Sequence, residues 1–172
     1  MQALIVYESA WGNTQEIAQA ISQGLSEEDI DSQLSDIQDA PALDQVDVDL
    51  LVVGAPTHAF GLSREATRED AHHRGGALIV SGVREWLDSA PVSLTVATFD
   101  THVRHPNLPG HASRKAAKKL RKLGCTLLTD PESFNVEDYD GPLSPGEHDR
   151  ARAWGHELGR RLMGRYPAEQ EA

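Results

Sequence analysis

The sequence predicts an α/β fold built on a parallel β-sheet. Strand-like and helix-like segments alternate about five times along the 172 residues. The segments 3–7 and 50–54 are apolar throughout, and 94–99 is apolar except for two threonines; none has the polar alternation of a half-exposed strand. Strands that are covered by helices on both faces have this pattern. Because the chain has an ordinary domain length and no internal repeat or linker, we expect a single domain, residues 1–172.

The first strand leads into a turn that is suited to binding an anion. After strand 3–7, residues 8–12 include a hydroxyl and a glycine, and Asn13 with Glu16 resembles a capping box, which predicts the start of a helix. The first N–H groups of a helix are unpaired and its dipole is positive at that end. A phosphate can therefore bind here without Lys or Arg. We expect the side chain of Glu8 to point into solvent, away from such a charge.

The next segments predict a helix, an edge strand and a second buried strand. One helical face is formed by Ile17, Ala18, Ile21 and Leu25. Residues 33–37 alternate between polar and apolar, which predicts a half-exposed edge strand. Pro41 predicts the start of a short helical turn. The fully apolar run 50–54 predicts a strand in the interior of the sheet.

A long connection, residues 57–80, follows the second buried strand. It is rich in polar, charged and glycine residues. Loops of this length are commonly functional or mobile. Within it, residues 63–73 predict a short helix, and the apolar spacing after it predicts another helix over 82–89.

The third buried strand, 94–99, precedes a second long loop, 100–110, and a helix that Gly124 ends. The apolar face of this helix consists of Ala112, Ala116, Leu120 and Leu123. Its opposite face consists of Arg114, Lys115, Lys118, Lys119, Arg121 and Lys122. Such a basic face is usually the solvated side of a helix, and docking of an acidic partner is the alternative.

The C-terminal part predicts a divided strand and a long helix. Residues 126–128 form a short strand that continues at 133–136 after a turn. For the last helix, Ser144 predicts the cap, Pro145 the first helical position and Glu147 the third member of a capping box. Its buried face consists of Ala151, Trp154, Leu158 and Leu162.

Composition excludes several classes of partner. The chain has 16 Lys and Arg against 27 Asp and Glu, which gives a formal charge of −11. This charge argues against nucleic acid or an anionic membrane as the main partner, but not against a phosphorylated small molecule held by backbone N–H groups. One cysteine, Cys125, cannot form an internal disulfide, and we expect it to be buried in the core. Without a signal peptide or a long apolar run, the expected location is the cytoplasm.

The histidines do not predict a metal site. His72 and His73 are adjacent in the sequence, and the others lie on different loops, whereas metal ligands have to converge. His58 and His102 follow buried strands. Each of these two can contact a ligand or anchor its own loop, and the sequence does not decide between these roles.

Three loops leave the carboxyl ends of the predicted strands, where parallel α/β sheets bind their ligands. Their sequences are YESAWGNT at 7–14, GAPTHAFG at 54–61 and TFDTH at 98–102. The first resembles the phosphate-binding loop of flavodoxins, the second resembles their second flavin loop, and the third stands where their third flavin loop would be. The resemblance follows the order of elements over nearly the whole chain. It implies a three-layer, doubly wound, five-stranded parallel sheet in the order 2-1-3-4-5, with FMN as the cofactor.

The resemblance also implies which residues contact FMN. Residues of the first loop would surround the phosphate, and the other two loops would lie on either side of the isoalloxazine ring. The implied cofactor-binding residues are Ser9, Ala10, Trp11, Gly12, Asn13, Thr14, Pro56, Thr57, His58, Ala59, Phe60, Gly61, Phe99, Asp100, Thr101 and His102. Trp11 departs from the family, which usually has a hydroxyl residue at this position.

Three functions are consistent with these features. The first is an FMN-binding electron-transfer protein of the flavodoxin type, which would exchange electrons with a redox partner such as a flavin or iron–sulfur reductase. The second is a flavin-dependent NAD(P)H:quinone-type reductase with a small-molecule acceptor, because the second loop also resembles that of flavodoxin-like quinone reductases. The third is a flavin-free binding module, which the substitution at Trp11 favours. The sequence leaves the oligomeric state undetermined.

Overall fold

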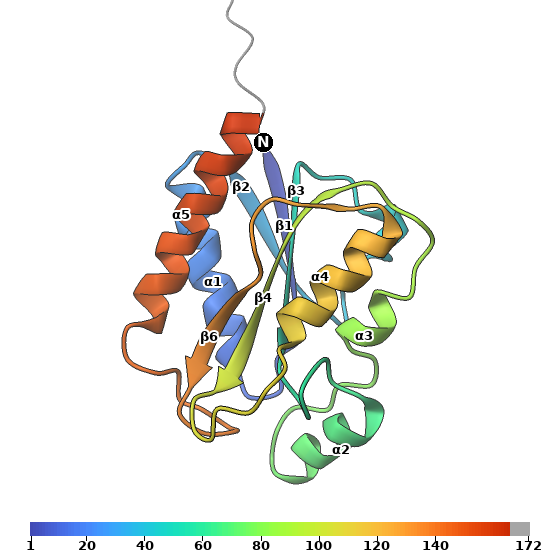
Figure 1. Cartoon of the computed structure of the whole chain (residues 1–172), viewed down its shortest axis with the longest axis vertical. Coiled ribbons are helices and arrows are strands. Elements are labelled where there is room, and N and C mark those ends of the chain that lie inside the picture. The colour runs from blue at the N-terminus through green and yellow to red at the C-terminus, as the bar shows by residue number, and fades with distance from the viewer. Residues whose placement is uncertain (166–172) are drawn as a thin grey trace, which may run out of the picture.

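The computed structural model describes residues 1–165 and contains one parallel sheet flanked by helices (Figure 1). The strands are β1 (Gln2–Tyr7), β2 (Asp31–Asp36), β3 (Leu50–Pro56), β4 (Thr95–Val103), β5 (Thr126–Leu127) and β6 (Glu132–Val136). They run in the order β2-β1-β3-β4-β5, and β6 pairs with β4. The predicted sheet order and the predicted edge strand are confirmed.

The last position of the sheet is shared by two short strands. β5 pairs with Thr95 and Val96 at the start of β4, and β6 pairs in parallel with residues 99–103 farther along the same strand. Between them the chain bends at Leu128 and Thr129, two residues before the predicted turn at Asp130–Pro131. The order of the predicted five-stranded sheet is therefore the observed one, except that its fifth strand is divided in two.

Helices cover both faces of the sheet. On one face lie α1 (Asn13–Ser26) and α5 (Glu147–Arg165), and on the other α3 (Val83–Trp86) and α4 (Ala112–Leu123). α2 (Glu65–His73) lies beyond the sheet, near the carboxyl ends of the strands (Figure 1). A short 3-10 helix, Leu43–Gln45, stands just after Pro41, where the sequence predicts a helical turn. No helix among residues 1–165 is long and apolar enough to cross a bilayer.

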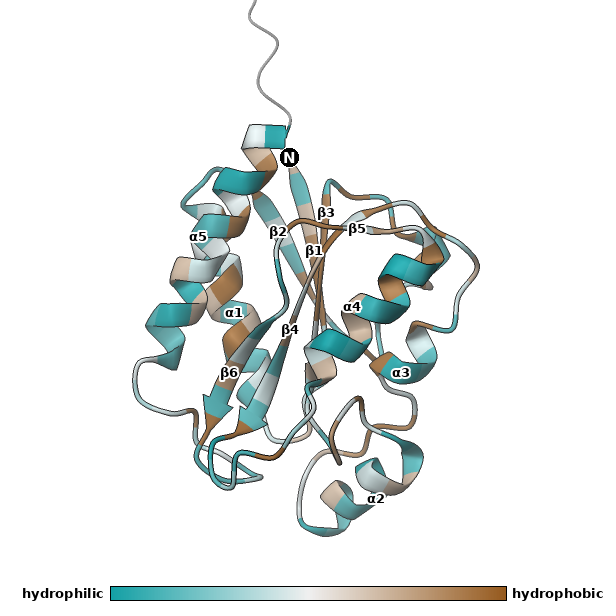
Figure 2. Cartoon of the chain, viewed as in Figure 1, coloured by the Kyte–Doolittle hydropathy of each residue, from teal (hydrophilic) through white to brown (hydrophobic). Residues whose placement is uncertain are grey.

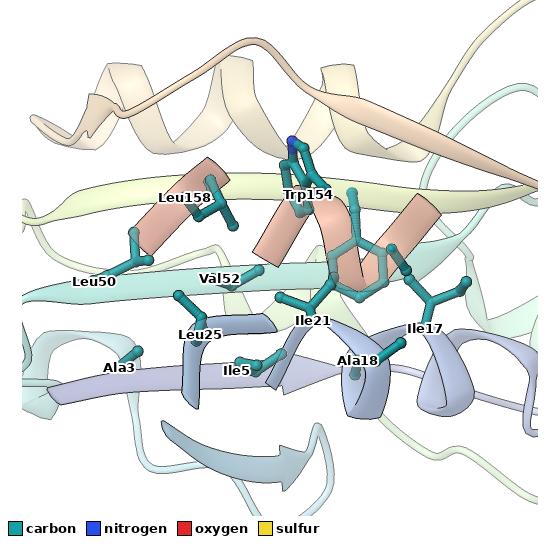
Figure 3. Packing of buried hydrophobic residues seen from close by; sticks show 14 of the residues in the cluster. Ala3, Ile5, Ile17, Ala18, Ile21, Leu25, Leu50, Val52, Trp154 and Leu158 are labelled. Carbon is teal, nitrogen blue, oxygen red and sulfur yellow. The ribbon is translucent and has the colours of Figure 1, made fainter. Parts of the chain in front are cut away.

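Successive residues of the central strands supply two separate cores. Ile5 and Val52 face α1 and α5, whereas Val6 and Val53 face α3 and α4. Figure 3 shows the first core, in which side chains of β1, β3, α1 and α5 pack together. Because burial of one large aliphatic side chain contributes about 1.5–3 kcal/mol, these alternating apolar faces account for the layered architecture. Figure 2 shows the hydrophobic central strand β3 between helices that have hydrophilic bands.

Both predicted capping boxes are wrong. Gly12, with a φ of 90°, is the N-cap of α1, Asn13 is already helical, and its side chain makes no capping bond. The last helix begins at Glu147 rather than Pro145, because Gly146 has a left-handed φ of 86°. The buried hydroxyl of Ser144 has no hydrogen-bond partner among the described residues. The predicted buried face of this helix is confirmed.

Two boundaries also differ from the prediction. β4 continues through Val103, so residues 100–103 belong to a strand and not to a loop. Polar residues are tolerated in this buried strand because neighbouring elements supply hydrogen bonds to them. The predicted helix over 82–89 is reduced to the four residues of α3. Gly124, with a φ of 113°, ends α4 as predicted.

Candidate functional site

A cavity of about 300 Å³ lies at the carboxyl ends of β1, β3 and β4, beneath α2. Its walls consist of Ser9, Ala10, Trp11, Asn13, Thr14, Pro56, Thr57, His58, Ala59, Thr67, Asp70, Ala71, Arg74, Thr101, Val103, Val136 and Tyr139. This volume is at the lower end of the range for small-molecule sites. The position is the one where parallel α/β sheets bind their ligands.

The turn after β1 contains unpaired backbone donors that belong to residues lining this cavity. The Ser9 hydroxyl accepts hydrogen bonds from the N–H groups of Gly12, at 3.0 Å, and Gln15, at 3.4 Å. Within residues 1–165, the four other N–H groups of Ala10, Trp11, Asn13 and Thr14 have no hydrogen-bond partner. Together with the positive end of α1, they can hold an anion without a cationic side chain.

Trp11 joins this turn to the segment that follows α2. Its indole ring lies against Gly76, where an added Cβ atom would be 3.1 Å from Cε2. The N–H of Ala77 donates to the carbonyl oxygen of Ala10 at 2.8 Å. The indole also meets the ring of Tyr139 edge-on, with centroids 5.7 Å apart. Trp11 therefore anchors α2 to the turn and forms part of the cavity wall.

α2 brings a cation to the cavity that the sequence analysis did not identify. Arg74 forms an ion pair with Asp70 at 3.2 Å, and its guanidinium lies 5.2 Å from the centre of the Tyr139 ring. Both members of the ion pair are more than half exposed, so the pair itself contributes little to stability. The wall formed by α2 thus contains one positive and one negative side chain.

The second loop forms a tight turn with strained residues. His58 and Gly61 exchange backbone hydrogen bonds of 2.8 and 3.0 Å, and Ala59 and Phe60 between them have positive φ values of 43° and 72°. Residues other than glycine adopt this region at a cost, and such strain is common at binding loops. His58 Nδ1 lies 3.2 Å from the Thr67 hydroxyl. Burial, and to a lesser extent the nearby Arg68, lowers the pKa of His58.

The end of β4 divides its residues between the cavity and the interior. Thr101 lines the cavity, and its hydroxyl lies 2.9 Å from that of Thr14. Phe99, two residues earlier on the same face of β4, packs in the core instead. The ring nitrogens of His102 lie 2.8 and 3.1 Å from the carbonyl oxygens of Val103 and Leu108, and its ring packs on that of His111. His102 therefore anchors its own loop.

The expectation that Glu8 points into solvent is wrong. Its side chain is buried, and one carboxylate oxygen accepts a hydrogen bond from the N–H of Val83 at 2.9 Å. The other oxygen has no partner among the described residues. Burial raises the pKa of this carboxyl group, and the Ser63 hydroxyl, the Val83 N–H and Arg68 offset the effect only in part. Tyr7 and Glu8 point to opposite faces, so the side chain that follows the strand enters the layer of α3.

Ten of the sixteen residues implied by the resemblance line the cavity. The other six are Gly12, Phe60, Gly61, Phe99, Asp100 and His102. The residues that the sequence analysis missed come from α2 and its C-cap Arg74, from the ends of β4 and β6, and from Tyr139. The long 57–80 connection was a signal for those of α2, whereas no local pattern marks Tyr139. No cluster of three or more potential metal ligands occurs among residues 1–165.

Comparisons with known proteins agree with this geometry. The flavodoxin family model matches residues 5–81, which include the first two loops. A flavodoxin from the domain Archaea is 21% identical, with a TM-score of 0.66 over 94% of this chain and 99% of that chain. Oxidised flavodoxin 1 from Bacillus cereus is 20% identical, with a TM-score of 0.68 over 93% and 98%. No curated protein matches the sequence significantly.

A larger protein contains a similar part. The flavodiiron core of Flv1 from Synechocystis sp. PCC6803 is 17% identical, with a TM-score of 0.63 over 96% of this chain but only 36% of that chain. At these identities the structural likenesses establish the fold. The fold is therefore that of the flavodoxins, and the flavodoxin family model matches the part of the chain that contains the first two loops.

Proposed function

We propose that the cavity binds FMN and that the protein transfers electrons in the manner of a flavodoxin. The observation that carries this proposal is the set of four unpaired N–H groups at the start of α1, whose residues line a cavity that is also lined by the β3 and β4 loops. FMN has a phosphate at one end and a flat ring at the other. The N–H groups would hold the phosphate, and the ring would lie between the two loops. The flavodoxin family model over residues 5–81 supports the same cofactor.

The chain offers a distinct role to each wall. The phosphate would be held by the Thr14 hydroxyl and by the four unpaired N–H groups, those of Ala10, Trp11, Asn13 and Thr14. Thr57, His58 and Thr101 would border the isoalloxazine ring, and the lowered pKa of His58 leaves this imidazole neutral near pH 7. When bound, FMN supplies the ring that accepts and returns electrons, while the protein positions it and sets its potential.

Titration with FMN and with riboflavin tests the proposal, because only FMN has the phosphate. We expect one FMN per chain, measured by quenching of flavin fluorescence, and weaker binding of riboflavin. Thr14→Val, which keeps the shape but removes a hydroxyl, should weaken FMN binding about tenfold and should affect riboflavin less. Thr126→Val on β5 is the matched control, because its exposed hydroxyl lies outside the cavity. A protein that neither quenches FMN nor melts at a higher temperature with it contradicts the proposal.

A second measurement separates a carrier from a reductase. A carrier should accept electrons from NADPH only through an added reductase, whereas a quinone-type reductase would oxidise NAD(P)H directly with a quinone as acceptor. We expect the first result. Saturable NAD(P)H-dependent quinone turnover by the protein alone would contradict it.

A further inference from the structure

Positive charge is concentrated in one segment of this anionic protein. Residues 101–129 contain seven Lys and Arg, among them every lysine of the chain, and no Asp or Glu. The rest of the sequence has nine Lys and Arg against 27 Asp and Glu. The formal charge of −11 is therefore the sum of a basic segment and a far more acidic remainder.

The fold exposes these cations on one side of the protein. Ala116 and Leu120 hold the apolar face of α4 against the sheet, so its basic residues face outward. Of the seven Lys and Arg in residues 101–129, six are exposed. They form what we call the basic surface: Arg104, Arg114, Lys115, Lys118, Arg121 and Lys122. Figure 2 shows the corresponding hydrophilic bands along α4. Within residues 1–165, the only α4 cation in a salt bridge is Lys119, which contacts Asp88 at 2.9 Å.

The basic surface adjoins the cavity. At the start of α4, the N–H of Ala112 donates to the hydroxyl of Thr57, a cavity residue, at 3.1 Å. The side chain of Lys115 lies beside Gly61, where an added Cβ atom would be 3.5 Å from its Cγ atom. Arg104 directly follows Val103, which also lines the cavity. A protein that covers the basic surface would therefore lie close to the mouth of the cavity.

Two exposed apolar side chains lie on the loops next to the cavity and the basic surface. Phe60 is 53% exposed and Leu108 is 49% exposed. Their loops touch, because the backbone of Gly110 packs against that of Phe60. An apolar centre with a charged rim is the usual composition of a protein–protein interface. A solvated helix side alone would not account for this arrangement.

We propose that the basic surface, with Phe60 and Leu108, docks an acidic redox protein next to the cavity. Only the statement that the partner is a redox protein rests on the proposed function. A folded acidic protein can present its negative charge to α4 alone, whereas an RNA or an anionic membrane extends over the acidic remainder and is repelled by it. The opposite charges of the two parts of this chain also orient the partner before contact.

Binding to two redox proteins of opposite charge tests this proposal. The probes are an acidic plant-type [2Fe–2S] ferredoxin and the basic cytochrome c, each added to ¹⁵N-labelled protein at about 50 mM salt, where charge interactions are weakly screened. We expect ferredoxin to shift the amide signals of residues 104–122 and of Phe60, with an affinity that falls as salt is added. Cytochrome c should leave those signals unchanged.

Charge reversal then locates the interaction. Lys115→Glu with Lys118→Glu should weaken ferredoxin binding about tenfold or more. The matched control is Arg160→Glu with Arg161→Glu on α5, which changes the net charge equally at exposed positions on the other face of the sheet. This control should weaken binding far less. Circular dichroism of both variants verifies that they are folded.

Three outcomes would overturn the proposal. One is ferredoxin binding that is absent, that maps elsewhere or that both variants weaken equally. Another is cytochrome c binding at the basic surface. The third is binding of RNA or of anionic phosphatidylserine vesicles at this surface when ferredoxin does not bind. The titration is made with and without FMN, so that failure of FMN binding is recognised separately from failure of docking.

Discussion

Glu8 and Asp100 are both buried carboxylates at the carboxyl edge of the sheet, yet their surroundings differ. Each directly precedes a cavity residue, Ser9 and Thr101 respectively. Asp100 Oδ2 accepts hydrogen bonds from both the N–H and the hydroxyl of Ser113, at 2.9 and 2.6 Å. Its Oδ1 accepts one from a second serine hydroxyl at 2.5 Å. Glu8 has one such bond, and its second oxygen has none among the described residues.

The difference shows that donors, and not burial alone, determine whether an interior carboxylate is stabilised. A buried charge without hydrogen bonds is costly, and the same group with several donors is tolerated. The nearest cation to Glu8, Arg68, is already engaged by Glu85 at 2.7 Å and by Ser63. Burial therefore dominates and raises the pKa of Glu8.

The comparison also distinguishes the two walls of the cavity. Asp100 ties β4 to α4 and β6 through side chains and backbone at once. Glu8 ties β1 to α3 through a single backbone N–H. We therefore expect the wall on the β4 side to depend on its carboxylate, and the wall on the β1 side to depend mainly on packing.

Replacement of Asp100 should have the largest effect. Asp100→Ala leaves the Ser113 N–H and two serine hydroxyls without their acceptor in the interior. We expect the free energy of unfolding to fall by about 3 kcal/mol, because each buried unsatisfied donor costs about 1–3 kcal/mol and the groups relax in part. Urea denaturation at pH 7 measures it.

Asp100→Asn serves as the matched variant. It keeps the size and one acceptor oxygen, so it should cost clearly less than Asp100→Ala. Equal losses from the two substitutions would mean that the hydrogen bonds of the carboxylate do not stabilise this wall, and the contrast with Glu8 would lose its basis.

Replacement of Glu8 should have a smaller effect, of opposite sign and dependent on pH. In the unfolded chain Glu8 releases its proton near its ordinary pKa of 4.5, whereas the folded protein retains the proton to higher pH. The folded state then binds more protons, so the free energy of unfolding declines as pH rises above 4.5. Glu8→Gln removes this decline. We expect no gain at pH 4 and a gain of about 1 kcal/mol at pH 8.

The measurement is urea denaturation of both proteins between pH 4 and pH 8. Glu69→Gln, at an exposed position of α2, is the control and should show no comparable rise relative to the parent protein. A gain from Glu8→Gln that is greatest at pH 4 and disappears at pH 8 would show that the folded protein stabilises the charged carboxylate, contrary to the comparison.

The sequence predicted the architecture because apolar periodicity records which face of an element is buried. The apolar pattern is long enough in β1, β3, α4 and α5 to specify whether the element is a strand or a helix and which face is buried. These buried faces are confirmed. The first loop was also identifiable, since a strand, a glycine turn and a helix start follow one another in the chain. These are local properties, and a single sequence contains them.

The donors around each carboxylate could not be predicted in this way. Glu8 bonds to a residue 75 positions away, and Ser133 reaches Asp100 across 33 positions. Polarity alone placed Glu8 in solvent and Asp100 in a loop, because no local pattern reveals a distant donor. Trp11 is a similar case: its partner is the Gly75–Gly76 pair at the end of a connection whose path the sequence leaves open.

The smallest predicted effect concerns the turn that joins the two walls. His58 contacts Thr67 of α2 on one side, and Phe60 contacts Gly110 on the other. Ala59, between them, has a φ of 43°, a conformation that costs a non-glycine residue about 1 kcal/mol. Ala59→Gly removes this strain but increases the entropy of the unfolded chain, so we expect a net gain of about 0.5 kcal/mol.

Ala42→Gly is the matched control for this turn. Ala42 is exposed and has an ordinary φ of −55°, so only the entropy cost remains and stability should fall by about 0.5–1 kcal/mol. Thermal denaturation of both variants measures the difference. If Ala59→Gly destabilises the protein as much as Ala42→Gly does, the turn is unstrained. The two walls would then meet without cost, and their different stabilities would arise from the buried carboxylates alone.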